Sequence, residues 1–393
     1  MSKDPLVILS ARRTPVGAFQ GVFAGLTGPE LGSAAIRAAV ADSAVPATDV
    51  DEVIMGCVLS AGLGQAPARQ AALGAGIPAS VPSTTVNKMC GSAMRAIMQA
   101  GDQILAGSAR IIVAGGLESM TNAPYLLPKA RAGYRMGHQQ VLDHMFTDGL
   151  QSPWDGQLMG CFAEATSGRY DFSRQAQDDY ARESSRRAQA AISSGAFASE
   201  IAPVTVKTRK GETVVDQDET PGTIDVSKIP TLKPAFSKNG TVTAASSASI
   251  SDGAAAVVLT RESVARERGL KPLARVLGYS SFAREPEWFT LAPVGAIGKL
   301  LKQIEWRAQD ADLYEINEAF AVVAMAAMKD LELDHAKVNV NGGAVALGHP
   351  IGATGARILT TLLYALESRG QKRGIASLCI GGGEATAIAI ERI

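Results

Sequence analysis

Two cysteines near opposite ends of the chain lie in segments typical of reactive thiols, and a histidine lies between them. Cys90 follows an apolar run and precedes Gly91-Ser92, where a helical pattern begins. Cys379 precedes the glycine run 381–383, and His349 lies in a Gly-His-Pro sequence. One thiol can hold an acyl group, a second can move a proton, and an imidazole can act as base. These residues therefore predict carbon–carbon bond chemistry on thioesters.

The surroundings of Cys90 favour a nucleophile over the commoner alternative, a small buried hydrophobe. The glycine and serine that follow open a helix, so its first amide groups and positive dipole end lie near the sulfur. Together with a neighbouring imidazole, they could lower the thiol pKa from about 8.5 to about 7, which is roughly 2 kcal/mol of thiolate stabilisation. The setting thus predicts a depressed pKa at Cys90.

The other candidate residues each allow a structural alternative. His349 could be a satisfied structural histidine, and glycines 381–383 could simply form tight turns. Such turns also expose backbone N–H groups that can bind an oxyanion, which thioester chemistry needs. Asn317, at a predicted strand-to-helix junction, could be an N-cap or could hold a water in the cleft. The glycines around His349 lack Gly-x-Gly spacing, which disfavours a nicotinamide enzyme.

Length, composition and charge limit the class of protein. A chain of 393 residues exceeds the usual size of one core, so two or three packed units are expected. It is 46% hydrophobic but only 5% aromatic and has 40 glycines, which favours close-packed α/β layers. Basic and acidic residues both total 38, so global charge predicts no nucleic-acid or membrane partner. Scattered cysteines without zinc-ligand spacing or a secretory start predict reduced thiols, no metal site and a cytoplasmic protein.

Strand and helix patterns alternate through the first 120 residues and again after residue 251, which predicts parallel βαβ units. Residues 121–250 interrupt this alternation with prolines, many charges and a polar helix over 174–193, so we expect a covering insertion there. The predicted strands are 6–9, 53–59, 111–114 and 252–259, and the predicted helices are 30–44, 91–106 and 319–328.

Two short segments of the first part of the chain are echoed in the last part. Residues 113–119 resemble 379–385, and residues 85–87 resemble 339–341. Short matches among small residues also arise by chance, so duplication and coincidence are both open. A duplicated α/β unit would place related loops of both halves around one cleft, with strand C-terminal ends facing the ligand.

The motifs occur in the order and spacing of the thiolase family, which the chain resembles over essentially its whole length. The resemblance implies an α/β fold of the thiolase type, duplicated and five-layered (α-β-α-β-α), with an inserted loop domain. The expected N-terminal half is 1–120 plus 251–271, the loop domain covering the CoA site is 121–250, and the C-terminal half is 272–393. The matching segments are 86–94, 317–320, 348–355 and 379–383.

The resemblance also implies a role for each site residue. Cys90 would be acylated, His349 would activate it, and Cys379 would exchange a proton with the second acyl-CoA. The backbone N–H groups of Cys90 and Gly381 would form one oxyanion hole, and His349 with a water held by Asn317 would form the other. Substrate and CoA contacts are implied at Leu150, Met159, Phe236, Ala244, Ser247 and Phe320.

The implied reaction is the reversible Claisen condensation of two acetyl-CoA molecules to acetoacetyl-CoA and CoA, through an acyl-Cys90 intermediate. A homotetramer or homodimer is implied, with CoA thioesters as substrate and product and no other cofactor. One alternative is a longer-chain 3-oxoacyl-CoA thiolase of fatty-acid β-oxidation. Another is a non-catalytic thiolase-like subunit of a multienzyme complex. A ketoacyl carrier-protein synthase is disfavoured by Cys379 in its glycine setting.

Three departures from the short-chain members concern the loop domain. Leu158 stands where those members have a histidine, and Ala248 stands where the family has a serine that contacts CoA. The arginine often found near the adenine has no clear counterpart in 219–222. The preferred acyl-chain length is therefore left open by the sequence.

Overall fold

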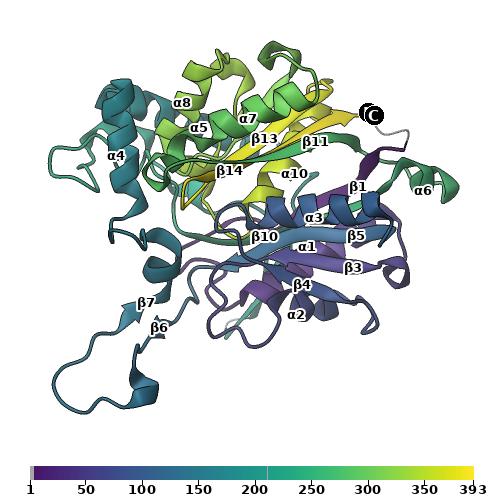
Figure 1. Cartoon of the computed structure of the whole chain (residues 1–393), viewed down its shortest axis with the longest axis horizontal. Coiled ribbons are helices and arrows are strands. Elements are labelled where there is room, and N and C mark those ends of the chain that lie inside the picture. Colours follow the sequence, from purple (N-terminus) through teal and green to yellow (C-terminus); the bar gives the residue numbers. More distant parts are fainter. Residues whose placement is uncertain (1–3, 210) are drawn as a thin grey trace.

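The computed structural model describes residues 4–209 and 211–393, and it shows two α/β halves with an insertion that lies to one side of them (Figure 1). The N-terminal half alternates strands and helices as predicted, and its last strand follows the insertion. Its elements are β1 (Leu6–Arg13), β2 (Gly17–Ala18), α1 (Gly28–Ser43), β3 (Glu52–Gly56), α2 (Pro67–Gly74), β4 (Ser83–Val86), α3 (Ser92–Ala106), β5 (Ile111–Ser119), β10 (Ser251–Arg261) and α6 (Glu262–Glu267).

The C-terminal half repeats this order of strands and helices. In the position of β4 it has only a parallel bridge between Tyr314 and Val338. Of the similar segments, 113–119 lies within β5, whereas 379–385 spans the end of β13, the glycine turn and the start of β14; β5 and β13 hold the same place in the element order of their halves. The elements are β11 (Ala274–Ala283), α7 (Ala292–Gln303), β12 (Leu313–Ile316), α8 (Ala321–Asp330), α9 (Ala344–Leu347), α10 (Thr354–Ser368), β13 (Arg373–Ile380) and β14 (Glu384–Arg392).

The strands of both halves form one ten-stranded sheet, in the order β12-β13-β14-β11-β1-β10-β5-β3-β4, with β2 beside β10. The predicted parallel pairs are β3 with β4 and β5, and β12 with β13. β1 and β11 join the halves through a short antiparallel pairing of Leu6–Ile8 with Ala274–Val276. The carboxyl ends of the parallel strands consequently lie on one side of each half, where ligands of open α/β sheets bind.

Helices divide the structure into five layers. α3 and α10 pack against each other between the halves, and their apolar side chains share one core with the inner faces of the strands of both halves. α1 and α2 cover the outer face of the N-terminal half, while α7 and α8 cover that of the C-terminal half. This is the α-β-α-β-α arrangement that the resemblance implied.

The insertion contributes no strand to the large sheet within the described residues. Its helices pack against α8 and α9 of the C-terminal half, whereas its first hairpin extends away from the body (Figure 1). The predicted polar helix is found over Arg174–Ser193. The elements are β6 (Tyr125–Leu126), β7 (Leu142–Asp143), α4 (Met159–Tyr170), α5 (Arg174–Ser193), β8 (Val204–Thr208) and β9 (Gly211–Val215). The domain boundaries themselves stay a prediction.

Some element boundaries differ from the predicted ones for identifiable reasons. The strand predicted over 53–59 ends at Gly56, because the N–H groups of Val58 and Leu59 bond the Glu118 carboxylate instead of a neighbouring strand. The strand predicted over 111–114 continues to Ser119 beside β10. Across the described residues, none of the helices is long and apolar enough to cross a membrane.

Candidate active site

Cys90 lies in a tight turn between β4 and α3. Met89, directly before it, has a φ of +48°, a left-handed conformation that is uncommon for a residue with a side chain. The Ser92 hydroxyl stabilises this turn by accepting from Lys88 N at 2.8 Å and donating to Met89 O at 2.7 Å. Gly91 is the N-cap of α3, so the predicted helix start is confirmed and Cys90 lies at its positive end.

The glycine turn of the C-terminal half closes over this cysteine. The backbone N–H of Gly381 lies near enough to the sulfur of Cys90 to act against the rise of its thiol pKa, and a β-carbon at Gly91 would lie 2.4 Å from Ile380 Cδ1. An ion pair between Lys88 and Glu384 joins the same two segments. A β-carbon at Gly381 would lie 3.4 Å from Met159 Sδ, so the insertion covers the turn from its other side.

The pKa predicted for Cys90 is wrong in direction. Burial raises the pKa of this thiol to about 11, and the charge of Glu118 raises it further. The N–H groups of Gly381 and of Cys90 itself act in the opposite direction but do not prevail. The N–H donors at the helix start are present, but desolvation of the Cys90 thiol outweighs them, and it depends on packing from the C-terminal half. Cys90 is therefore a protonated thiol at neutral pH and needs a base.

Cys379 is the last residue but one of β13 and is fully buried. Burial raises the pKa of its thiol well above the usual value, and the neighbouring Cys90 adds to the rise. The structure thus brings together the two cysteines that the sequence separates by almost three hundred positions. All four cysteines of the chain are free thiols.

His349 is held in the tautomer that a base requires. The Thr354 hydroxyl lies 2.7 Å from Nδ1 and donates its single proton to the carbonyl oxygen of Pro350 at 2.9 Å. The hydroxyl must therefore accept from Nδ1–H, which leaves Nε2 as the basic nitrogen. Nε2 is buried and has no hydrogen-bond partner in the described part of the chain. Burial, and then the charge of Arg357, lowers the pKa of His349 to about 3, so the ring is neutral.

A buried carboxylate, Glu118, connects the His349 loop to the nucleophile half. Its oxygens accept from the N–H groups of Gly352 at 2.8 Å, Val58 at 3.1 Å and Leu59 at 3.0 Å. Burial raises its pKa to about 7 against these donors. The segments approach so closely that a β-carbon at Gly116 would lie 2.0 Å from the Gly352 oxygen. Glu118 belongs to the segment 113–119 that resembles 379–385, but sequence reasoning did not identify it as the acceptor for these three N–H groups.

Asn317 lies between β12 and α8, as predicted, and is 1% exposed. It is not an N-cap, because α8 begins after Phe320. Its N–H donates to Ser377 O at 2.9 Å, and its Oδ1 accepts from Arg357 Nη2 at 3.4 Å. Within the described residues its Nδ2 has no hydrogen-bond partner. Within the described residues, the Asn317 side chain therefore has an unpaired N–H donor at the junction of β12 and α8.

The neighbouring Glu318 anchors the insertion to this corner of the site. Its carboxylate accepts from Tyr180 OH and Ser184 Oγ of α5, both at 2.8 Å, and from Val345 N at 3.1 Å. Asn339 donates to the same carboxylate at 2.8 Å and also bonds the backbone of Ile316. Sequence reasoning missed both residues, although Glu318 follows Asn317 directly in the quoted motif.

Most of the positions implied for substrate and CoA contacts gather near the glycine turn. Phe236 and Phe320 pack edge to face with ring centroids 5.8 Å apart. Ser247 pairs with Phe320 in an antiparallel bridge and donates its hydroxyl to Thr243 O at 2.7 Å. Leu150 packs in the cluster that contains Cys90, and Met159 lies over Gly381. Ala244 is exposed in the short turn before Ser247. Their roles as contacts stay predictions.

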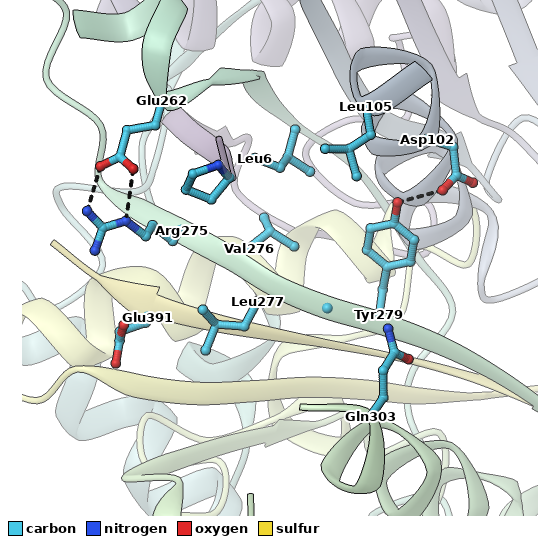
Figure 2. A pocket seen from close by; sticks show the side chains of 12 residues that line it. Leu6, Asp102, Leu105, Glu262, Arg275, Val276, Leu277, Tyr279, Gln303 and Glu391 are labelled. Carbon is cyan, nitrogen blue, oxygen red and sulfur yellow. Dashed lines mark hydrogen bonds and ion pairs between the residues drawn. The ribbon is translucent and has the colours of Figure 1, made fainter. Parts of the chain in front are cut away.

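A separate cavity of about 650 Å³ lies where the two halves join, at the far end of α3 (Figure 2). Its ionisable side chains are largely paired with one another. Tyr279 points to Asp102 and donates to it at 2.6 Å, and Arg275 pairs with Glu262 at 2.5 Å (Figure 2). None of the predicted site residues lines this cavity. The chemistry predicted from the motifs therefore belongs to the loops around Cys90.

The chain belongs to the thiolase family. The family model described as thiolase, N-terminal domain, matches residues 6–263, and that described as thiolase, C-terminal domain, matches residues 270–392. Together they span nearly the whole chain, in agreement with the five-layered fold.

Three relatives that match over their full length are named acetyl-CoA acetyltransferase. An acetyl-CoA acetyltransferase of Cupriavidus necator is 49% identical over 391 residues, covering 98% of this chain and 99% of that protein. Those of Escherichia coli K12 and Schizosaccharomyces pombe are 49% and 47% identical, covering 98% and 100% of this chain and 99% and 100% of their own lengths. The crystal structure of the Bacillus anthracis acetyl-CoA acetyltransferase matches with a TM-score of 0.97 at 43% identity, covering 99% of each chain.

Proposed function

We propose that this protein is an acetyl-CoA C-acetyltransferase that reversibly condenses two acetyl-CoA molecules to acetoacetyl-CoA and CoA through an acyl-Cys90 intermediate. The names of its full-length relatives support the activity. The observation that supports the mechanism most directly is the meeting of Cys90, the Gly381 N–H and Cys379 between the two halves.

The first step is acyl transfer to Cys90. His349 Nε2 takes the thiol proton while the sulfur attacks the thioester carbon, and CoA then leaves with that proton. The negative charge on the carbonyl oxygen is stabilised by the N–H groups of Cys90 and Gly381. Because the thiol has a pKa of about 11 and the imidazole one of about 3, we expect proton transfer to accompany attack instead of preceding it.

The second step forms the carbon–carbon bond. Cys379 takes an α-proton from the second acetyl-CoA while its own thiol proton passes to His349 Nε2, and the resulting enolate attacks the acyl carbon on Cys90. The Cys90 sulfur leaves and receives the proton from His349, so Cys379 ends as a thiol that holds the α-proton. Burial, and then the neighbouring Cys90, raises the pKa of Cys379, so this thiol is protonated in the free enzyme and a base must take its proton as it acts.

This reaction balances with CoA thioesters alone, because it transfers an acyl group and protons but no electrons to an acceptor. We accordingly propose CoA, acetyl-CoA and acetoacetyl-CoA as ligands, without another cofactor. The protruding hairpin of the insertion exposes several large apolar side chains, which supports association into a dimer or tetramer. Its most exposed apolar residues are Tyr125, Leu127, Met136 and Val141. Sedimentation equilibrium tests the oligomeric state, and cytoplasmic location stays a prediction.

Covalent labelling tests the nucleophile. Incubation with labelled acetyl-CoA followed by peptide mapping should place the acetyl group on Cys90, and Cys90→Ala should remove both label and activity. Cys161→Ala, at another free cysteine, is the matched control and should keep both. Stable labelling elsewhere with none at Cys90 would refute the assignment.

A longer-chain 3-oxoacyl-CoA thiolase is the second candidate, because Leu158 lies where short-chain members have a histidine and so presents an apolar side chain near Met159. Rates of thiolysis measured from four-carbon to sixteen-carbon 3-oxoacyl-CoA distinguish the two. We expect the highest kcat/KM with acetoacetyl-CoA. A maximum at eight carbons or more would replace the short-chain assignment.

A further inference from the structure

Arg357 is a buried cation directly behind Asn317. It belongs to the first turn of α10 and is 2% exposed. Its Nη2 donates to Asn317 Oδ1 at 3.4 Å, and its Nη1 lies 3.9 Å from Glu315 Oε2. The described residues offer no hydrogen-bond partner to its Nε and Nη1, nor to Glu315 Oε1. A guanidinium and a carboxylate are thus both buried here with incomplete pairing.

Incomplete pairing of buried charges is costly, so a native structure that retains it needs a reason. A pair kept for stability alone would be expected to have direct hydrogen bonds, which a separation of 3.9 Å does not allow. Among the described residues, the Arg357 side chain donates a hydrogen bond to Asn317 alone. The arrangement therefore indicates that the main partner of Arg357 is the side-chain amide of Asn317 and not the carboxyl group of Glu315.

We propose that Arg357 is a positioning residue that fixes the orientation of the Asn317 amide, with Glu315 holding the guanidinium in place. A guanidinium has only donors, so it selects the oxygen end of the amide. Nδ2 must then face away from Arg357 and stays a donor for the enolate oxygen, directly or through a water. Without Arg357 the amide can rotate by half a turn and present an acceptor to that oxygen, which repels it. This inference rests on the proposed condensation at Cys90.

The proposal predicts that the two half-reactions respond differently to loss of Arg357. Acetylation of Cys90 uses His349 and the Gly381 N–H, whereas only enolate formation and condensation use the Asn317 amide. In Arg357→Met we expect condensation to slow at least tenfold while the burst of CoA release from acetyl-CoA stays within about threefold. Arg357→Lys, which keeps a donor, should recover part of the condensation rate.

Two further variants separate positioning from folding. Arg357→Met with Glu315→Gln removes the guanidinium together with the buried carboxyl group that could ionise without it, and it should show the same loss of condensation. Arg369→Met is the matched control, because Arg369 also acts on the charge of Glu315 but donates to Asn341 instead of Asn317. It should condense at the wild-type rate. A pair variant that folds and condenses normally would overturn the proposal.

A double-mutant cycle gives the decisive readout. If Arg357 acts through the amide, then Asn317→Ala with Arg357→Met should condense no more slowly than Asn317→Ala alone. Multiplied losses in the double variant, or equal losses in both half-reactions of Arg357→Met, would instead show a general structural role. Failure of the wild-type protein to acetylate Cys90 would refute the proposed function, an outcome distinct from all of these.

Discussion

Arg13 and Arg357 are the two largest fully buried side chains in the described residues, yet their surroundings differ in a decisive way. Arg13 donates to both oxygens of Asp218, at 2.7 and 2.9 Å, and to Glu200 at 2.5 Å. Arg357 has one long bond to an amide and a carboxylate at 3.9 Å. Burial lowers the pKa of both, but the carboxylates raise that of Arg13 above its usual value, whereas that of Arg357 stays below.

This difference distinguishes the ion pairs of Arg13, which are structural, from the partial pairing of Arg357 beside the candidate active site. Arg13 belongs to β1, and both of its partners belong to the insertion, so its bonds hold the insertion to the sheet. Arg357 lies beneath Asn317 and acts on the pKa of His349. A buried cation whose donors are all paired thus indicates a structural connection between two parts of the fold. A partly paired one indicates a site where a ligand or water supplies the remaining hydrogen bonds.

The largest expected effect is a loss of stability in Arg13→Met. The substitution leaves Asp218 and Glu200 buried without their cation, which should lower the free energy of unfolding by about 3–5 kcal/mol. Urea denaturation followed by circular dichroism measures it. Arg110→Met is the control, because Arg110 pairs with Glu267 at the surface and should cost only about 0–1 kcal/mol. Equal losses in the two variants would show that the buried ion pairs of Arg13 add nothing to the free energy of unfolding.

Arg357→Met should destabilise the fold less, by about 1–2 kcal/mol, although its side chain is as deeply buried. Burial already raises the pKa of Glu315 to about 8. With Arg357 in place this carboxyl group is therefore already largely protonated at neutral pH, so removal of the cation leaves no unpaired buried charge. The same denaturation experiment measures the loss. A cost equal to that of Arg13→Met would contradict the contrast between the two arginines.

The sequence predicted the architecture well because its signals are local. The helical periodicity of 174–193 and the apolar run of 6–9 are readable from neighbouring residues, and the structure confirms both elements. The strand predicted over 53–59 was too long because Val58 and Leu59 bond Glu118, about sixty positions away. Hydrophobic periodicity does not register such a partner.

The site could be predicted in composition but not in electrostatics. The motifs around Cys90 and Cys379 indicated two thiols that the fold brings close enough for Cys90 to raise the pKa of Cys379. The pKa of Cys90 was predicted in the wrong direction, because desolvation depends on packing from the other half of the chain. Arg357 was not identified at all, since an arginine inside an apolar helical pattern has no local signal of what it faces.

Buried Glu315 should also make stability depend on pH. Its pKa is raised to about 8 in the folded state, so the folded protein binds more protons than the unfolded chain between about pH 4.3 and 8. Stability should therefore fall as pH rises through this window, by at most about 1.4 kcal/mol per unit for one proton. Glu315→Gln should flatten that decline in denaturation experiments at several pH values.

Glu183 provides the opposite case as a control. Hydrogen bonds from Arg186 and then Arg187 lower its pKa to about 2, despite some burial. Its contribution to stability is present above about pH 4.3 and is lost only as pH falls towards 2. Glu183→Gln should leave the slope between pH 5 and 8 unchanged. A flattened slope in this variant, or an unchanged slope in Glu315→Gln, would contradict the assignment, whereas a residual slope is expected from Glu118, whose pKa burial raises to about 7.

The smallest expected effect concerns the tautomer of His349. Thr354→Val removes the hydroxyl that accepts from Nδ1–H, so part of the imidazole should carry its proton on Nε2 and be unable to act as base. We expect acetylation of Cys90 to slow roughly fivefold, about 1 kcal/mol, while Thr354→Ser keeps the rate. Thr360→Val is a matched control, because Thr360 makes the same kind of bond, to Ala356 O at 2.9 Å, without touching His349. Since both valine variants lose one hydroxyl bond on α10, slower acetylation in Thr360→Val as well would assign the effect to the helix and not to the base.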